Sequence, residues 1–234
     1  MLSRLVLKRG AKHEGESPFW ISFSDLMSAL MVLFLVVMAV TLVSVTQSID
    51  AATRASRERS DAIERVMRMI ATDPKSAGVG IDQKNFRIDL GKEVRFESGS
   101  YTISNTAGQF LRNYVPVLLR AKESPDGHRW IRSVVVEGFT DEDGTYLYNL
   151  QLSLDRSRSV VCSLFQSNGP ADALTSGQLR KVQELFLVGG YSFNSIKKDK
   201  AESRRVELKI DFWGLDEEIP ETSDVLKGKE FGRC

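Results

Sequence analysis

A long apolar run near the N-terminus dominates the pattern of hydrophobic and polar positions along the chain. From Leu26 to Ser48 the sequence carries no charged side chain and is rich in Leu, Val, Met and Phe. A membrane-spanning helix needs about 20 mostly apolar residues, so this run is long enough to cross a bilayer. The pattern predicts an N-terminal segment over residues 1–18 and a single transmembrane helix, in contact with the lipid bilayer, over residues 19–48.

The segment after this span, residues 49–80, is highly charged and favours a helix through Met69. Its apolar residues recur at spacings of three and four and form a narrow stripe on a helix, made of Ile63, Val66, Met67 and Ile70. We favour a solvated linker helix. Packing of the stripe on a second copy, on a neighbouring protein or on the membrane surface stays open.

Residues 81–213 combine the periodicities of strands and helices. Alternating or continuous apolar residues predict strands near 86–96, 134–136, 185–189 and 206–212. Apolar residues at helical spacing predict a helix after the capping residue Ser104, with a kink or a late start at Pro116. They also predict a second helix after Asn149 and Ser153, closed by Gly169, and a short helix over residues 178–184.

The order of these elements is strand, helix, strand, helix, strand, strand, apart from the short helix. It predicts an α+β domain of βαβαββ type, with the helices packed on one face of a mixed sheet. Residues 214–234 lack periodicity, and we interpret them as a C-terminal tail.

One acidic residue, Asp25, interrupts the otherwise uncharged stretch between Ser17 and Ile49. A carboxylate in a transmembrane helix costs about 3 kcal/mol on insertion scales, so such residues usually serve a function. We interpret Asp25 as an ion-carrying group that faces a protein partner. Two alternatives stay open: its carboxylate reaches the membrane interface, or it caps the helix together with Ser22 and Ser24. A cleaved secretory signal fits poorly, because the apolar core is too long.

Composition and charge exclude several classes of function. A net charge of +1 gives no electrostatic footprint for nucleic acid, so no direct nucleic-acid partner is expected. The two histidines, His13 and His128, are far apart, and no metal site or resident cofactor is predicted. We find no arrangement typical of a catalytic centre and predict that the protein is not an enzyme. Cys162 and Cys234 form no disulfide framework by spacing, and Cys162 is predicted to be a buried thiol.

The stretch from Gly138 to Phe165 resembles the OmpA-like peptidoglycan-binding domain. The family's signature is present as Gly138-Phe139-Thr140-Asp141, Gly144, Tyr148-Asn149 and Leu152-Ser153-Leu154-Asp155-Arg156, and its later Asn-Arg-Arg-Val motif as Ser203-Arg204-Arg205-Val206. The similarity extends over about residues 86–212. It implies binding of a peptidoglycan stem peptide, with Asp141 and Arg156 holding its diaminopimelate and with Thr140, Asn149, Leu152 and Arg205 assisting.

The implied chemistry suits these side chains, since a carboxylate binds an ammonium group and a guanidinium binds a carboxylate. Two residues depart from the family pattern. Phe139 replaces a histidine, which is expected to alter the rim of the pocket, and Ser203 replaces an asparagine, which is expected to weaken one polar contact. Without the resemblance, a local salt bridge between Asp141 and Arg156 would be the favoured interpretation.

The N-terminal stretch Phe23-Ser24-Asp25-Leu26-Met27-Ser28 resembles the B subunits of ion-driven stators, the group that contains MotB, PomB, ExbD and TolR. This resemblance implies that Asp25 carries the transported ion, a proton or sodium. It also implies a homodimer whose two spans lie inside a ring of five MotA-like or ZorA-like membrane subunits. The expected location is the bacterial inner membrane, with the N-terminus in the cytoplasm and the C-terminal domain in the periplasm.

Within this group the chain most resembles the stator-like B subunits of the Zorya anti-phage defence system, because the linker is short and an unusual turn, residues 126–130, precedes the central strand. A helix over residues 50–70 is expected to close the channel until the domain docks on the cell wall. Two other functions stay open: a flagellar MotB-like stator, and a passive tether between membrane and wall that transports no ion.

Overall fold

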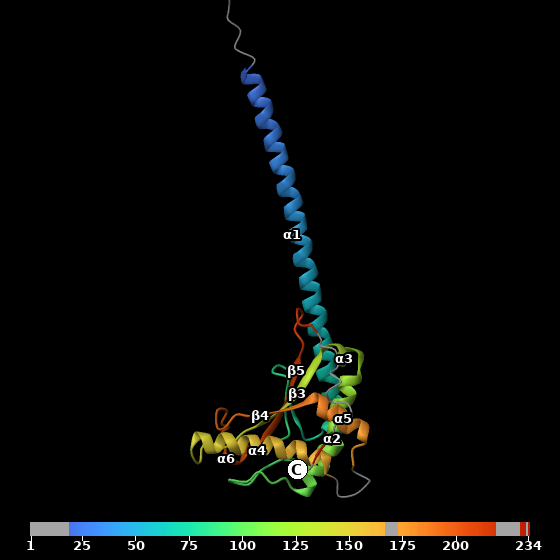
Figure 1. The fold of residues 1–234 in the computed structure, drawn as a ribbon, viewed down its shortest axis with the longest axis vertical. Helices are drawn as coiled ribbons and strands as arrows, with labels where there is room; N and C mark the ends of the chain where they lie inside the picture. Colours follow the sequence, from blue (N-terminus) through green and yellow to red (C-terminus); the bar gives the residue numbers. More distant parts are fainter. Residues whose placement is uncertain (1–18, 167–172, 219–229, 233) are drawn as a thin grey trace, which may run out of the picture. The chain divides into compact units, whose positions relative to one another are not determined.

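The computed structural model describes residues 19–166, 173–218, 230–232 and 234. The chain divides into two compact units, one ending at Arg54 and one beginning at Ala55. One helix, α1 (Phe19–Thr72), contributes residues to both units (Figure 1). Each unit is considered separately below.

The part of α1 in the first unit is a candidate membrane span. It contains an 18-residue window of mean hydropathy 2.8, and none of this window is buried inside the protein. Its hydroxyl groups bond within the helix: Ser28 Oγ donates to the carbonyl of Ser24, and Thr41 Oγ1 donates to the carbonyls of Val37 and Met38. Such internal bonds leave few free polar groups, as a lipid environment requires.

The part of α1 in the second unit belongs to the folded domain. The stripe predicted from the sequence is buried, with exposed fractions of at most 4% for Ile63, Val66, Met67 and Ile70. These side chains are part of the same hydrophobic core as the sheet and its helices. The solvated linker helix predicted for residues 49–80 is therefore wrong in its C-terminal part, because the domain's core needs this stripe as one of its walls.

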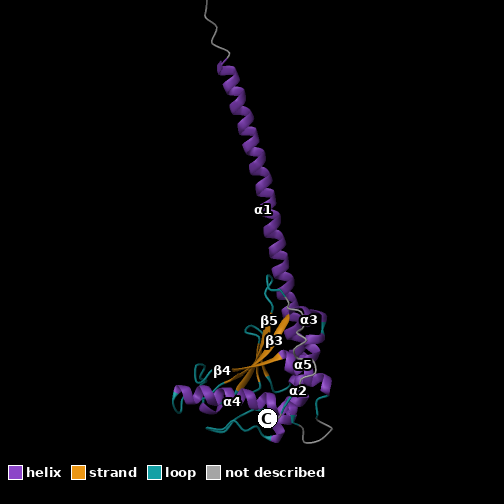
Figure 2. Cartoon of the chain, viewed as in Figure 1, coloured by secondary structure: helices purple, strands orange, loops and turns teal. Residues whose placement is uncertain are grey.

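The sheet of the second unit has five strands: β1 (Gly80–Asp82), β2 (Arg87–Asp89), β3 (Ile131–Gly138), β4 (Phe186–Gly190) and β5 (Val206–Phe212). Their order is β1-β2-β5-β3-β4. β3 and β4 are parallel, and the other neighbours are antiparallel. Figure 2 shows the strands in orange and the helices in purple. The predicted mixed sheet of an α+β domain is confirmed.

Five helices follow α1 among the described residues: α2 (Asn105–Glu123), α3 (Pro125–Trp130), α4 (Tyr146–Phe165), α5 (Ser176–Leu185) and α6 (Lys200–Ser203), and a short 3₁₀ helix, η1 (Pro74–Ser76), links α1 to the sheet. Ser104 caps α2 as predicted, since its hydroxyl accepts from the backbone N–H of Ala107. Pro116 lies inside α2, so the predicted late start is wrong. α4 begins at Tyr146, before rather than after Asn149 and Ser153, and the expected stop at Gly169 lies outside the described residues.

Alternation along the strands gives the sheet one apolar and one charged face. Val134, Val136 and Leu208 point into the core with the helices. On the other face Arg87 forms ion pairs with Glu137 and Glu207, both of which are buried. Ion pairs with Arg87 therefore account for the burial of the two glutamates on the central strands.

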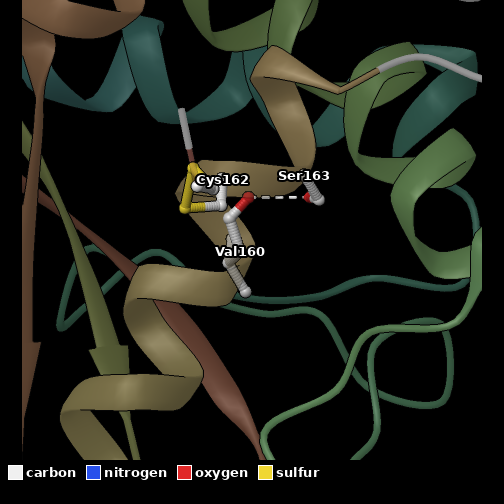
Figure 3. Close-up of a disulfide and its surroundings, with 4 residues drawn as sticks. Val160, Cys162 and Ser163 are labelled. Atoms are coloured by element: carbon white, nitrogen blue, oxygen red, sulfur yellow. Dashed lines mark hydrogen bonds between the residues drawn. A yellow bond between two sulfur atoms is a disulfide. The ribbon is translucent and has the colours of Figure 1, made fainter. Parts of the chain in front are cut away.

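The two cysteines form a disulfide between α4 and the C-terminal residue, with their Cα atoms 5.9 Å apart (Figure 3). The predicted buried free thiol at Cys162 is therefore wrong. The two residues lie 72 positions apart, and a single pair at such a separation has no distinctive spacing. Cys234 ties the end of the predicted tail to the domain, while residues 219–229 and 233 of that tail are outside the described residues.

Candidate functional site

The predicted wall-binding residues lie where β3 ends and α4 begins. Two glycines allow this helix to approach the sheet closely. A Cβ on Gly138 would lie 2.0 Å from the carbonyl oxygen of Ser153, and a Cβ on Gly190 would lie 2.6 Å from the hydroxyl of the same serine. Both strand ends therefore require glycine, and the close contact fixes α4 over the ends of β3 and β4.

Arg156 on α4 is fully buried and serves as the centre of this region. Its guanidinium donates to three carbonyl oxygens: Nε to Ser100 at 2.9 Å, Nη1 to Phe139 at 2.9 Å and Nη2 to Glu97 at 3.1 Å. Burial lowers the pKa of Arg156 to about 10, although the nearby Asp141 carboxylate opposes this shift. The arginine remains charged at neutral pH and holds the end of β3 against the loop of residues 97–104.

Asp141 is also buried, but its ion pair is with Arg204. Arg204 Nη1 donates to Asp141 Oδ2 at 2.9 Å, while its Nε donates to the carbonyl of Phe96 at 3.1 Å. The local salt bridge considered from the sequence thus has a different cation. Arg156 and Arg204 together bring two positive charges to the neighbourhood of one carboxylate. The charge of Arg204 lowers the pKa of Arg156, as burial does, whereas the charge of Asp141 raises it.

Two buried polar atoms near Asp141 have no hydrogen-bond partner among the described residues. They are the hydroxyl oxygen of Thr140 and the side-chain oxygen of Asn149. The amide nitrogen of Asn149 donates to the carbonyls of Asp143 at 2.9 Å and Thr145 at 3.3 Å, which fixes the side chain. Unpaired buried polar atoms are costly, at about 1–3 kcal/mol each, so a ligand with donors would relieve the cost. Leu152, the remaining predicted residue of α4, is buried.

Arg205 lies in a different environment from the other predicted residues. Its Nε donates to Glu207 at 2.6 Å, its Nη1 donates to the carbonyl of Ser195 at 3.1 Å, and its guanidinium lies 4.2 Å from the centre of the Phe139 ring. Phe139 is itself buried and stacks on Tyr191 at 5.4 Å. Phe139 therefore takes part in the packing around Arg205.

Ser203, the second departure from the family pattern, is fully buried. Its hydroxyl donates to the carbonyl of Asp199 and accepts from the backbone N–H of Lys197, both at 3.0 Å. The serine thus closes the turn that presents Arg204, and it satisfies its own hydrogen bonds locally.

Sequence reasoning missed Arg204 and Lys200 as members of the site. Lys200 Nζ lies 2.5 Å from Asp143 and 3.7 Å from Glu142, and the hydrogen bond that Lys200 donates to Asp143 raises the pKa of Lys200. The adjacent arginines Arg204 and Arg205 could have indicated a second basic site residue. Successive side chains at a strand point to opposite faces, so the two arginines are expected to have different surroundings. Alternation shows that only one of the two arginines faces Asp141, but it does not show which one.

The site is suited to binding rather than catalysis. A carboxylate such as that of Asp141 can bind an ammonium group, and a guanidinium such as that of Arg204 can bind a carboxylate. The described part of the chain holds no group of three or more His, Cys, Asp or Glu side chains that would bind a metal ion.

In the first unit, Asp25 shares one face of α1 with small and branched residues. Asp25, Ser28, Ala29, Val32 and Val36 line a single shallow surface. Their spacing of three and four residues places them on the same side of the helix. A partner helix packing on this face would cover the carboxylate.

Comparison with known proteins connects the two units. The OmpA family matches residues 95–201, and the family described as membrane MotB of the proton-channel complex MotA/MotB matches residues 7–53. These ranges contain Asp25 and all the predicted wall-binding residues except Arg205.

The chain is 40% identical over 222 residues to the Zorya protein ZorB of Escherichia coli O139:H28, which covers 94% of this chain and 90% of that protein. It is 23% identical to the Zorya protein ZorB of the Escherichia coli strain Crooks, over 89% of this chain and 94% of that one. A crystal structure of the periplasmic domain of Helicobacter pylori MotB superposes with a TM-score of 0.42 at 16% identity, covering 62% of this chain and 85% of that chain.

Proposed function

Because the chain belongs to the family of the Zorya protein ZorB, we propose that it is the wall-anchored B subunit of an ion-driven, stator-type complex in the bacterial inner membrane, and that this complex acts in anti-phage defence. The observation that carries the proposal is the presence in one chain of two separate functional features. One is an isolated carboxylate, Asp25, in a candidate membrane span. The other is the buried Asp141–Arg204 and Arg156 site in an OmpA-like domain.

Asp25 carries the transported ion, a proton or sodium, across the membrane. Two copies of the span lie inside a ring of MotA-like or ZorA-like subunits, which cover the face around Asp25. Movement of one elementary charge through 100 mV releases about 2.3 kcal/mol, and this energy drives rotation of the ring.

Asp141 and Arg156 hold the diaminopimelate of a peptidoglycan stem peptide, so the dimer stays fixed while the ring turns. An ammonium group of the ligand bonds to Asp141 and to the unpaired oxygens of Thr140 and Asn149. Ligand carboxylates pair with the guanidinium groups of Arg156 and Arg204. The buried, pre-formed arrangement supports this role, because the site loses little freedom when the ligand binds.

The disulfide supports a periplasmic domain and a cytoplasmic N-terminus. Disulfides persist in oxidising compartments such as the periplasm and are rare in the cytoplasm. The covalent bond between Cys162 and Cys234 therefore favours the topology in which the span leads from the cytoplasm to the wall.

The segment that closes the channel before docking is shorter than the sequence alone suggested. Residues 63, 66, 67 and 70 are core residues of the domain and cannot leave without unfolding it. A closing segment is therefore confined to about residues 49–62. Most side chains from Asp50 to Ser60 are exposed.

The Asp25→Asn variant tests the biological role, with Asp50→Asn as the matched control beyond the apolar run. Phage plating and swimming motility are measured in strains that carry the neighbouring genes. We expect Asp25→Asn to abolish phage protection and leave motility unchanged, and Asp50→Asn to change neither.

Loss of motility with intact protection would instead make the chain a flagellar stator subunit. If protection and motility both survive Asp25→Asn, the protein is a passive tether and the motor proposal fails.

A further inference from the structure

We propose that the Cys162–Cys234 disulfide is a reducible modification site, that its partner is a dithiol reductant of the cell envelope, and that its reduction weakens binding to peptidoglycan. This inference rests on the proposed wall-binding function. Four features of the second unit carry it: the accessibility of the disulfide, its place on α4, the cleft that it lines and the contacts of the C-terminal residues.

The disulfide is accessible to an external thiol. Cys234 is exposed and Cys162 is half-buried, so the disulfide lies at the surface of the domain. Thiol–disulfide exchange requires direct attack of a thiolate on a sulfur atom, and access therefore decides which disulfides are reducible. Structural disulfides in a protein core lack this exposure.

The disulfide is attached to the helix that carries the binding site. Cys162 lies six residues after Arg156 on α4, within two helical turns. Around Cys162 the helix is tightly held, since Ser163 is buried and its hydroxyl donates to the carbonyl of Val160 at 2.7 Å (Figure 3). The C-terminal residue is thus fixed to a rigid part of the site helix.

Both cysteines line a cleft of about 390 Å³ next to the binding site. Residues 101–105 also line this cleft and continue the loop whose carbonyls at Glu97 and Ser100 accept from Arg156. The 97–104 loop therefore contacts Arg156 and lines the same cleft as the disulfide. A change at the disulfide alters the surroundings of the loop that positions the buried guanidinium.

Among the described residues, only weak contacts accompany the covalent bond. Phe231 packs against Phe165, with 5.1 Å between ring centres, and Arg180 lies 5.7 Å from the Phe231 ring. Phe231 is 40% exposed, so these contacts bury little apolar surface. The disulfide is thus the main restraint on the described C-terminal residues, and its loss releases them from α4.

The reduction is a balanced two-electron exchange. A thiolate of the reductant attacks Cys234 Sγ, forms a mixed disulfide and displaces Cys162 as a thiolate, which takes up a proton. The second thiol of the reductant then attacks the reductant's first sulfur, which is bonded to Cys234 in the mixed disulfide. This attack displaces Cys234 as a thiolate, which is protonated in turn. The reductant ends as a disulfide, and the protein ends with two thiols.

The test measures co-sedimentation of the full-length, detergent-solubilised protein with purified sacculi, with and without dithiothreitol. Oxidised protein is expected to bind at least threefold more tightly than reduced protein. Cys234→Ser, which keeps Cys162, is expected to match the reduced protein and not to respond to dithiothreitol. Asp155→Asn, which changes another residue of the same cleft and keeps the disulfide, serves as the control and should respond as the wild type does.

Equal binding by oxidised and reduced wild-type protein would overturn the redox inference and leave wall binding intact. A response of Cys234→Ser to dithiothreitol would overturn it as well, because that variant has no disulfide between these residues. Failure of the oxidised wild type to bind sacculi would instead overturn the wall-binding function on which the inference depends. Circular dichroism of each sample shows that the domain stays folded during the comparison.

Discussion

At the scale of single residues, the buried charges of the site have different partners from those that a sequence motif suggests. Arg156 donates to three backbone carbonyls, and Asp141 pairs with Arg204. Asp141 and Arg156 were identified as site residues through a family resemblance, and the structure places both near the end of β3. Arg204 was missed, because its pairing depends on the tertiary fold. The residue lies just before β5, and Asp141 lies in a loop 63 positions earlier in the sequence.

Asp141→Asn keeps the size of the side chain and removes its charge. The variant is expected to bind sacculi about ten- to a hundredfold more weakly, since a hydrogen bond to a charged group contributes about 1.5–3 kcal/mol. Binding is measured by co-sedimentation with purified peptidoglycan.

Glu142→Gln is the matched control, because Glu142 is adjacent and its side chain is 49% exposed. It should bind within about twofold of the wild type, as exposed ion pairs contribute little. Equal binding by Asp141→Asn and Glu142→Gln would contradict a role for Asp141 in recognition.

At the scale of elements, the sequence located β3, β4, β5, α2 and α5 because their apolar periodicity is strong. The last strand shows this best: Val206, Leu208 and Ile210 alternate with charged residues and face the core. The strand predicted near residues 86–96 is shorter than expected, since β2 ends at Asp89; β1 and α6 were not predicted, and α3 forms where the sequence predicted a turn over residues 126–130. Helices α1 and α4 were predicted only in part. Helix α4 begins before the apolar residues from which it was predicted, because Thr145 caps its N-terminus. Its first turns include Asn149, a polar residue of the candidate site.

Helix α1 shows why the boundary between linker and domain could not be predicted. A narrow apolar stripe on a charged helix fits a solvated linker, a partner helix or a domain wall equally well. Only the fold decides among these, because the sheet and α2 leave a gap in the core that Ile63, Val66, Met67 and Ile70 fill. The OmpA-like domain therefore includes the last turns of α1.

Met67→Ala tests this extended domain boundary. Met67 is 1% exposed, so removing its side chain leaves a cavity and is expected to destabilise the domain by about 2–5 kcal/mol. Met69→Ala is the control on the same helix, because Met69 is 46% exposed and its truncation should change stability by less than about 0.5 kcal/mol. Urea denaturation of the two variants gives the comparison, and equal stabilities would show that α1 is dispensable for the fold.

At the scale of the whole molecule, the chain joins a candidate span containing one carboxylate to an OmpA-like domain with a candidate ligand site. Neither half defines the function alone, since a short motif around Asp25 is weakly specific and OmpA-like domains occur in proteins of several kinds. The disulfide was beyond prediction, because proximity of Cys162 and Cys234 arises only after residues far apart in sequence have packed. Its presence adds a covalent tie at the end of the chain.

The central claim is that Asp25 carries an ion through a complex whose other half is anchored to the wall. The most direct test is proton uptake into vesicles that contain this protein together with its MotA-like or ZorA-like partner. Asp25→Asn is compared with the wild type at equal amounts of assembled complex, with sodium present or absent. We predict that Asp25→Asn assembles normally and eliminates ion-driven flux, whereas undiminished flux through the assembled Asp25→Asn complex would contradict the claim.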